Sequence, residues 1–479
     1  MKGFEPEIVW SLFEKISSIP RCSAREKKLQ GWIEEWAGEN GVAFRKDEVG
    51  NILLYREPSQ GGGDIPTLTL QGHQDMVCEK TYGSDHDFDR DSLKLRVDGG
   101  VLSADGTTLG ADNGVGVAIA MAMMVEPGLG RHGRIEAVFT VEEETGLIGA
   151  IKMQPGFFTG KRMVNLDSEE LGVIIVSSAG GGGTIYAISV EWEDPQGWEG
   201  LSLQVKGLLG GHSGVDIHLP RLNANKLVGD ALKRVSERMR LRIIHIKGGT
   251  RGNAIPRSAN CDFLVPEGRA GEAAAVLNKW DAGLDKSDEE SLVTTLTEVR
   301  ASRCMSEKVS QSVIALITEV HQGVVSWSPD IEGLVQTSNN LGIVRTEEDA
   351  VVIPISSRSS DAEDLERDRE ILRRLGESHG AQVEQRPGYP GWKSDPSSPF
   401  LGLVSQVYEA ILGARPRVTG IHGGLECGFL SRLDPELQIV SVGPDIENPH
   451  SPQELVHIES VGRLYEVVKG IASSMGVEE

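Results

Sequence analysis

The segment from Val115 to Val125 constrains the fold most, because it contains no polar or charged side chain. It predicts a helix that is apolar on every side, and such a helix must be covered by the rest of the protein all round. The alternating stretch Thr67–Leu70 precedes it and the stretch Ile135–Val141 follows it, and alternation with a period of two predicts strands. Strand, helix and strand in this order predict an α/β architecture, in which helices cover a central sheet.

The chain has 479 residues, which at about 150 residues per domain suggests two to three domains. Two glycine-rich stretches are candidate boundaries, the run Gly180–Gly183 and the segment Arg386–Gly391. The glycine run predicts a hinge rather than a phosphate-binding loop, because no Lys-Ser or Lys-Thr pair follows it. Similar patterns predict helices over 5–19, 361–379 and 399–412, a hairpin around 98–100, and strands at 163–167 and 438–442.

Charge and cysteine content limit the possible partners and the compartment. The 48 Lys and Arg residues against 71 Asp and Glu residues leave a net charge of −23, which repels nucleic acids and anionic membranes. Five scattered cysteines without a CxxC pair are typical of a reducing compartment rather than of a disulfide framework. The N-terminus has no apolar signal core, and serines and glycines interrupt the longest uncharged run, 172–190. We therefore expect a cytoplasmic protein that binds neither nucleic acid nor membrane.

Side chains of the kind that bind metal ions follow several of the predicted strands. They are His73, Asp75, Asp112, Glu142–Glu144, Asp167 and His450. In open α/β sheets, ligands bind beyond the carboxyl ends of the strands. Each residue alone also has an ordinary structural explanation, such as a helix cap or a solvated turn. Together, histidines and carboxylates without thiolates form the ligand set of zinc, cobalt or manganese.

Converging carboxylates repel one another unless cations neutralise them. Two metal ions about 4 Å apart that share one carboxylate would balance this charge and would also stabilise a hydrolytic transition state. The residues therefore favour a metal-dependent hydrolase. No Gly-x-Ser-x-Gly motif supports a serine hydrolase. A metal-free binding or scaffold protein on the same fold is the alternative from another functional class.

A set of spaced motifs resembles the bacterial aminoacyl-histidine dipeptidases (peptidase D, cytosolic non-specific dipeptidases), which belong to the di-zinc exopeptidase superfamily that includes the carnosinases. In chain order these motifs are GHQDMV, LGADNG, EEETG, NLDSEE, GGHSG, GNA, SSR, HGGLECG and NPHSP. The resemblance covers nearly the whole chain. It implies a catalytic domain with a central mixed sheet flanked by helices, formed by residues 1–183 and 387–479. An inserted α+β domain over 184–386 would act as a lid and form a homodimer.

The resemblance also implies a set of ligands for two divalent metal ions. Zinc is the expected metal, with cobalt or manganese as alternatives. His73 and Asp167 would bind one ion, and Glu144 and His450 the other. The carboxylate of Asp112 would bridge the two ions, and the peptide bond between Asp112 and Asn113 would be cis.

The same resemblance implies that Glu143 is the general base that takes a proton from a metal-bridging water. Asp75 would orient His73 from behind. If the alignment shifts by one residue, Glu142 and Glu143 become base and ligand.

In the inserted domain, His212 resembles a histidine that reaches across a dimer to stabilise the oxyanion. Asn253 and Arg358 resemble residues that hold the C-terminal carboxylate of the substrate, a role that suits the planar guanidinium. His422 and Glu426 lie in a family motif and either line the site or pack behind it.

The implied reaction is the hydrolysis of unblocked dipeptides, Xaa-His dipeptides among them. A deacylase or carboxypeptidase of the same superfamily is the alternative. The family pattern favours the dipeptidase, because an aspartate at the position of Asp167 accompanies amino- and dipeptidases there.

Overall fold

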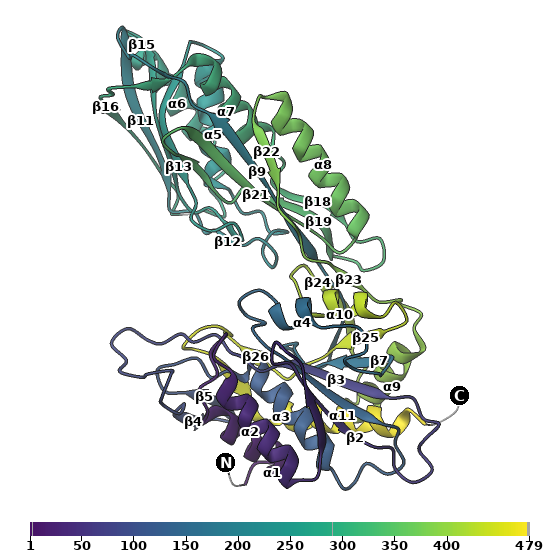
Figure 1. Cartoon of the computed structure of the whole chain (residues 1–479). Helices are drawn as coiled ribbons and strands as arrows, with labels where there is room; N and C mark the ends of the chain where they lie inside the picture. The colour runs from purple at the N-terminus through teal and green to yellow at the C-terminus, as the bar shows by residue number, and fades with distance from the viewer. Residues whose placement is uncertain (2, 290, 477–479) are drawn as a thin grey trace. The chain divides into compact units, whose positions relative to one another are not determined.

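The computed structural model describes residue 1, residues 3–289 and residues 291–476. The chain forms two compact units (Figure 1). Unit 1 consists of residues 1–177, 392–420 and 425–479, and unit 2 of residues 178–391 and 421–424. Both ends of the chain therefore belong to unit 1, and the middle of the chain forms unit 2.

A mixed sheet forms the centre of unit 1. In sheet order its strands are β1 (Ala43–Lys46), β2 (Ile52–Arg56), β6 (Ile135–Thr140), β3 (Leu68–His73), β7 (Arg162–Asn165), β25 (Gln438–Ser441), β8 (Val173–Ser178) and β23 (Trp392–Lys393), with β24 (Arg417–Ile421) paired to β8. The neighbours β6, β3, β7 and β25 run parallel. Their carboxyl ends therefore lie at one edge of the sheet.

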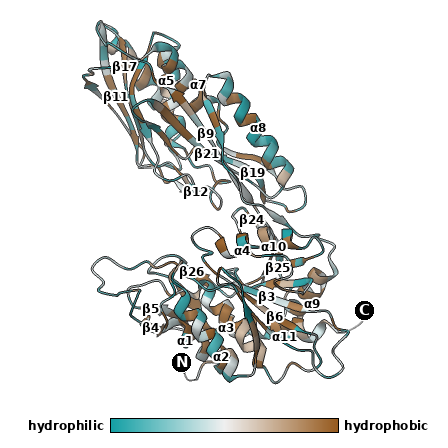
Figure 2. Cartoon of the chain, in the orientation of Figure 1, coloured by the Kyte–Doolittle hydropathy of each residue, from teal (hydrophilic) through white to brown (hydrophobic). Residues whose placement is uncertain are grey.

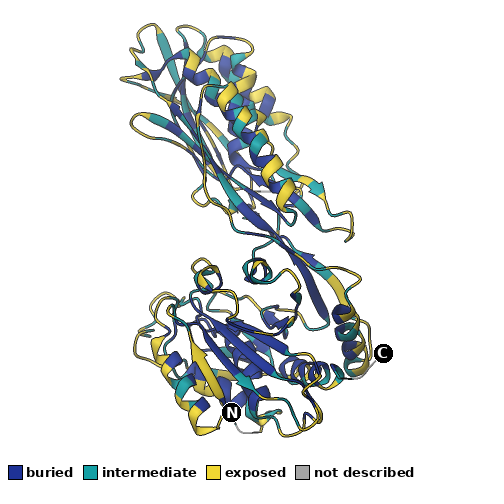
Figure 3. Ribbon diagram, turned by 45° about the vertical axis from the view of Figure 1, so that its right-hand side comes forward, coloured by how far each residue is buried: buried dark blue, intermediate teal, exposed yellow. Residues whose placement is uncertain are grey.

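The helices of unit 1 pack on this sheet. They are α1 (Glu7–Ser17), α2 (Lys27–Glu39), α3 (Ala111–Val125), α4 (Ile148–Lys152), α9 (Pro399–Leu412), α10 (Cys427–Leu433) and α11 (Ile458–Ser474). The side chains of α3 are buried from Val115 to Met124, as its all-round apolar sequence predicts. Figure 3 shows the central strands of unit 1 buried, whereas β1 at the sheet edge is exposed.

A smaller antiparallel sheet lies beside the main sheet of unit 1. It contains β26 (Ile446–Glu447), β27 (Leu455–His457), β5 (Val101–Ala104) and β4 (Leu95–Asp98). β4 and β5 form the predicted hairpin at Asp98–Gly100. The loop between β26 and β27 carries His450.

Unit 2 is built on a second, largely antiparallel sheet. In sheet order the strands are β16 (Val293–Val299), β11 (Trp198–Lys206), β15 (Ala259–Pro266), β13 (Arg242–Gly248), β20 (Val344–Thr346), β21 (Ala350–Ser359), β19 (Val335–Asn340) and β18 (Gly323–Trp327), with β9 (Gly180–Ser189) between β21 and β22 (Gln382–Gln385). Short strand pairs join β10 (Trp192–Glu193) to β17 (Cys304–Met305) and β12 (Gly211–His212) to β14 (Ala254–Ile255).

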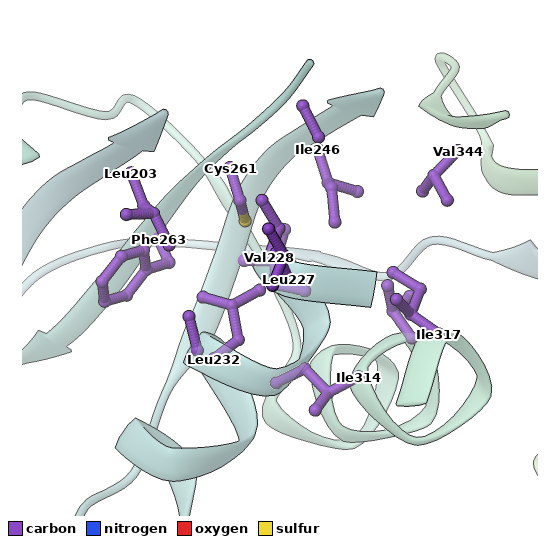
Figure 4. Close-up of a cluster of buried hydrophobic side chains, with 14 of the residues drawn as sticks. Leu203, Leu227, Val228, Leu232, Ile246, Cys261, Phe263, Ile314, Ile317 and Val344 are labelled. Carbon is purple, nitrogen blue, oxygen red and sulfur yellow. The ribbon is translucent and has the colours of Figure 1, made fainter. Parts of the chain in front are cut away.

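The helices that cover this sheet are α5 (Ala224–Ser236), α6 (Ala270–Ala282), α7 (Glu307–Glu319) and α8 (Ala362–Ser378). Residues from α5, α7 and the strands form a continuous apolar core, part of which Figure 4 shows around Leu232 and Phe263. Asp361 caps α8 by accepting hydrogen bonds from the backbone N–H groups of Glu363 and Asp364. The rest of α8 is mostly hydrophilic (Figure 2).

The run Gly180–Gly183, a candidate domain boundary, forms the first part of β9, paired residue by residue with β21, and lies next to the division between the units at residues 177 and 178. One sequence-based expectation differs from the structure. The cysteine pattern is typical of a reducing compartment, yet Cys22 and Cys78 form a disulfide. These two cysteines meet because Cys22 and Met76 form a parallel β-bridge. Within the described residues, no helix is long and apolar enough to cross a membrane.

Candidate metal centre and substrate-binding residues

The carboxyl edge of the main sheet in unit 1 gathers the metal-type side chains. His73 is the last residue of β3, and Asp167 follows β7. The Nε2 atom of His73 lies 2.9 Å from Asp112 Oδ1 and 3.2 Å from Asp167 Oδ1. Asp112 is in the first turn of α3, where its own φ/ψ is non-helical and its peptide bond to Asn113 is cis. The predicted cis bond is therefore present.

The two oxygens of Asp112 face two different histidines. Asp112 Oδ1 faces His73, whereas Oδ2 lies 3.0 Å from Nε2 of His450. The same Nε2 lies 3.1 Å from Glu144 Oε2. Asp112 thus lies between two groups of side chains, His73 with Asp167 and His450 with Glu144. A carboxylate between two such groups has the geometry that a bridging ligand requires.

Asp75 holds the acidic loop after β6 beside His73. Its carboxylate accepts hydrogen bonds from the backbone N–H groups of Glu143, at 3.0 Å, and Glu144, at 3.2 Å. Asp75 Oδ1 also lies 3.3 Å from Nδ1 of His73, and Ser23 Oγ donates to Asp75 Oδ2 at 2.7 Å. One fully buried carboxylate therefore fixes both a histidine and the Glu143–Glu144 backbone.

Two residues of the centre have left-handed backbone conformations that are unfavourable for non-glycine residues. Glu142 has φ of 50° and His450 has φ of 60°. Such strain costs on the order of 1–3 kcal/mol per residue and is concentrated at functional sites. The local sequence therefore does not fold this way by its own preference, and surrounding contacts must impose it.

The electrostatics of the centre are dominated by carboxylates. Burial raises the pKa of Asp112, but hydrogen bonds from His450 and His73 outweigh burial and hold it well below its ordinary value. Burial would lower the pKa of His73, but the charge of Asp167 and further hydrogen bonds raise it well above the usual value. Burial, together with repulsion from neighbouring carboxylates, raises the pKa of Asp167 to about 6 and that of Glu143 well above its usual range.

These residues fit a divalent metal ion. Single ligand atoms of His73, Asp112 and Glu144 all lie within 4.8 Å of one another. Glu144 Oε1 is buried and has no hydrogen-bond partner in the described part of the chain. An unpartnered buried carboxylate oxygen is costly unless a cation or a donor meets it. The nitrogen and oxygen donors are those that zinc, cobalt and manganese accept.

Arg21 is a buried cation that the sequence analysis missed. Its side chain is 1% exposed and donates hydrogen bonds to the backbone carbonyls of Gln74, at 3.0 Å, and Asp75, at 2.6 Å. It also donates to the carbonyl of Gly110, just before α3. Arg21 thus joins the backbone behind His73 to the backbone that carries Asp112.

Glu454 is a second buried ion that the sequence analysis missed. Its carboxylate accepts hydrogen bonds from four consecutive backbone N–H groups, those of residues Leu109–Asp112, at 2.8–3.3 Å. A carboxylate at this position satisfies the free N–H groups at the start of α3 and interacts favourably with the helix dipole. No local pattern marks Glu454, because it lies more than 340 residues along the chain from its partners.

Glu426, whose role the motif left open, lies behind the centre. Its Oε2 accepts hydrogen bonds of 2.6 Å from both Gln71 and Thr140, which are on β3 and β6. Burial raises the pKa of Glu426 to about 8. Glu426 therefore packs against the strands that carry the centre.

In unit 2, the expected substrate-binding residues occupy neighbouring segments. His212 on β12 pairs with Ala254 on β14, next to Asn253, and the backbone carbonyl of Asn253 accepts a hydrogen bond from Ser213. Nδ1 of His212 accepts weak hydrogen bonds from the following turn, which includes the N–H group of Gly214 at 3.3 Å. Burial and then the charge of Arg358 lower the pKa of His212.

Arg358 and His422 come together in the same unit. His422 Nε2 lies 2.7 Å from Ser338 Oγ, and Ser338 on β19 is the direct cross-strand neighbour of Arg358 on β21. Burial, followed by the charge of Arg358, lowers the pKa of His422 to about 4, so this imidazole is neutral at pH 7. Unit 2 thus presents a buried guanidinium beside two histidines with lowered pKa values.

The chain is similar in sequence and in structure to known peptidases. Residues 69–474 match the model of peptidase family M20/M25/M40. The chain is 36% identical to the cytosol non-specific dipeptidase of Escherichia coli (strain K12) over 470 residues, 97% of each chain. The crystal structure of aminoacylhistidine dipeptidase from Vibrio alginolyticus superposes with a TM-score of 0.91 at 35% identity, covering 100% of this chain and 98% of that one.

Human carnosine dipeptidase 1 shares the fold at 12% identity, with a TM-score of 0.51 over 98% of this chain and 96% of that one. The resemblance seen in the motifs and the α/β fold class are therefore confirmed. With a family model that spans most of its length and a relative that is similar end to end, the chain belongs to peptidase family M20/M25/M40.

Proposed function

We propose that this protein hydrolyses unblocked dipeptides, Xaa-His dipeptides among them, at a centre of two divalent metal ions. It is an M20-family enzyme that hydrolyses dipeptides. The observation that carries the two-metal proposal is the position of Asp112, whose two oxygens face His73 and His450. His73 and Asp167 would hold one ion, and Glu144 and His450 the other.

When bound, the two ions would supply Lewis acidity to the scissile carbonyl and a water of lowered pKa. Glu143 takes the proton of the attacking water and delivers it to the leaving amine. The grouping of Glu144 with His73 and Asp112 favours Glu144 as ligand and Glu143 as base over the alternative with Glu142 and Glu143. Asp75 keeps His73 and the Glu143 backbone in place.

Unit 2 supplies substrate recognition in this proposal. Arg358 pairs with the free C-terminal carboxylate, with Asn253 beside it, and His212 stabilises the oxyanion. The unit acts as a lid and joins two chains in a homodimer, so that His212 can serve the partner's centre. We further propose zinc as the native ion, with cobalt or manganese as alternatives, and a cytoplasmic location, in line with the name of the E. coli relative.

The test compares one Xaa-His dipeptide with its C-terminal amide, its N-acetyl form and a tetrapeptide, after each metal is restored to the stripped enzyme. Blocking either terminus leaves a buried partner unpaired and costs roughly 2–5 kcal/mol. We expect kcat/KM to be lower for the amide, the N-acetyl form and the tetrapeptide than for the free dipeptide. Faster cleavage of the N-acetyl form would indicate a deacylase instead. A purified protein without bound metal that stays inactive after metal addition would indicate a binding protein.

A further inference from the structure

Arg358 is a buried cation that has no anionic partner among the described residues. Its side chain is 8% exposed, and no ion pair joins it to a carboxylate in the described part of the chain. Its Nε is buried and has no hydrogen-bond partner among the described residues. Among the described residues, the guanidinium makes one hydrogen bond, of 2.8 Å from Nη1 to the hydroxyl of Tyr389. The N–H groups of Nε and Nη2 therefore lack a partner among the described residues and are left for a ligand carboxylate.

Four residues lie in one row across the sheet of unit 2. Ser338 on β19 is opposite Arg358 on β21, and Arg358 is opposite Gly181 on β9. Gly181 in turn forms a β-bridge with Tyr389, with hydrogen bonds of 2.9 and 3.0 Å between their backbones. Residues directly opposite one another place their side chains on the same face of a sheet. Arg358 and Tyr389 therefore share a face and are separated by one residue without a side chain.

Glycine at position 181 is what permits this contact. A Cβ atom there would lie 2.6 Å from two ring carbons of Tyr389 and 2.7 Å from its hydroxyl oxygen. The ring thus lies over the bare backbone of Gly181, and its other edge faces Gly424, where a Cβ would be 2.9 Å from the ring. Gly183, two residues further along β9, has no such contact, since its Cβ would meet only Arg386 at 3.8 Å.

From this geometry we propose that Tyr389 is a positioning residue for dipeptide specificity. Its hydroxyl holds Arg358 Nη1, so that the remaining N–H groups of the guanidinium point at the C-terminal carboxylate of the substrate. Gly181 provides the space for the Tyr389 ring. This inference rests on the proposed role of Arg358 in binding that carboxylate. Tyr389 acts through Arg358, so it sets the preference for a free acid and leaves the chemical step unchanged.

The experiment measures KM and kcat for one Xaa-His dipeptide and its C-terminal amide in wild type and in Tyr389→Phe. The variant keeps the ring and removes only the hydroxyl. We expect KM for the free acid to rise about tenfold, the order expected when a hydrogen bond to a charged group is lost, while KM for the amide and both kcat values stay unchanged. An unchanged ratio of acid to amide would show that Tyr389 only packs.

Gly181→Ala tests the same contact in a second way, because the added Cβ would displace the Tyr389 ring and its hydroxyl from Arg358. Gly183→Ala is the matched control on the same strand. Gly181→Ala should reproduce the loss of acid preference, and combining it with Tyr389→Phe should add little. Equal behaviour of Gly181→Ala and Gly183→Ala, with both folded by circular dichroism, would overturn the proposal.

Arg358→Ala separates this inference from the proposed function. If Arg358→Ala abolishes the acid preference and Tyr389→Phe does not, only the role of Tyr389 is wrong. If Arg358→Ala leaves the preference intact, the assignment of the carboxylate site is wrong and the inference fails with it.

Discussion

The two clusters of candidate functional side chains carry unbalanced charges of opposite sign. In unit 1, carboxylates outnumber the imidazoles His73 and His450, and Glu144 Oε1 has no partner in the described chain. In unit 2, the buried Arg358 has no carboxylate within ion-pair distance among the described residues. Buried charges are costly unless paired. Unit 1 is therefore suited to receive cations and unit 2 an anion, which are the metal ions and the substrate carboxylate in the proposed reaction.

The two clusters are also held in place by different means. Backbone groups fix the unit 1 cluster, since Arg21 and Glu454 bind main-chain carbonyls and N–H groups around Asp75 and Asp112. A side-chain hydroxyl orients Arg358 in unit 2. We expect substitutions in unit 1 to affect metal binding and chemistry, and substitutions in unit 2 to affect substrate preference.

The largest effect is expected from Asp112→Ala, which removes the residue between the two groups of ligands. We expect loss of both metal ions and of activity, because each ion loses the ligand that the two ions share. Metal content of the purified variant is the measurement, with the exposed Asp64→Ala as control. Full metal occupancy in Asp112→Ala would contradict the two-metal centre.

Glu143→Gln should separate chemistry from metal binding within unit 1. The amide keeps the size of the side chain but cannot accept the proton, so kcat should fall by at least about a hundredfold while metal content stays at the wild-type value. Glu142→Gln is the control. If that variant loses the activity instead, the base lies one residue earlier in the loop.

A smaller effect is expected from Glu454→Gln, which tests whether the Glu454 carboxylate supports the backbone that carries Asp112. The amide cannot accept the four N–H hydrogen bonds as a carboxylate does, so the loop that carries Asp112 loosens. Loss of such outer support typically costs about 10–100-fold in metal affinity. Competition with a chelator measures the affinity, and the exposed Glu459→Gln serves as control. Unchanged affinity would remove Glu454 from the metal centre.

The smallest effect is expected from His422 in unit 2. Its pKa is about 4 in the folded chain and about 6.5 when unfolded, so the unfolded state binds more protons in this range. Stability therefore rises with pH between 4 and 6.5, and falls as the pH is lowered through this window. From pH 7 to pH 6 the loss should be less than about 1 kcal/mol, and it should be absent in His422→Gln. Denaturant unfolding of both proteins at the two pH values tests this, and identical pH dependence would contradict it.

Local patterns predicted much of the fold of unit 1 and the convergence of its candidate ligands. The apolar helix at 115–125 and its flanking strands are present. Because β3 and β7 are parallel neighbours, His73 and Asp167 meet beyond their carboxyl ends, and the first turn of α3 places Asp112 Oδ1 2.9 Å from His73 Nε2. The roles of these residues remain predictions that the experiments above test.

The supporting residues could not be predicted in the same way. Glu454 meets residues more than 340 positions away, and Tyr389 reaches Arg358 only because Gly181 lies between them in the sheet. Such contacts depend on strand register and on the packing of distant segments, neither of which leaves a periodic pattern. For the same reason, the run Gly180–Gly183 did not indicate that Gly181 accommodates a tyrosine ring within a strand.

The order in which the chain is synthesised gives the C-terminal segment a particular importance. β25 lies between β7 and β8, and both His450 and Glu454 follow it. Proteins generally fold from the N-terminus as they leave the ribosome. A nascent chain that already contains His73, Asp112 and Asp167 therefore still lacks one candidate ligand and the carboxylate that holds the α3 start. Hydrolytic activity would arise only after His450 has been synthesised, and a chain ended before His450 should bind metal more weakly than one that contains it.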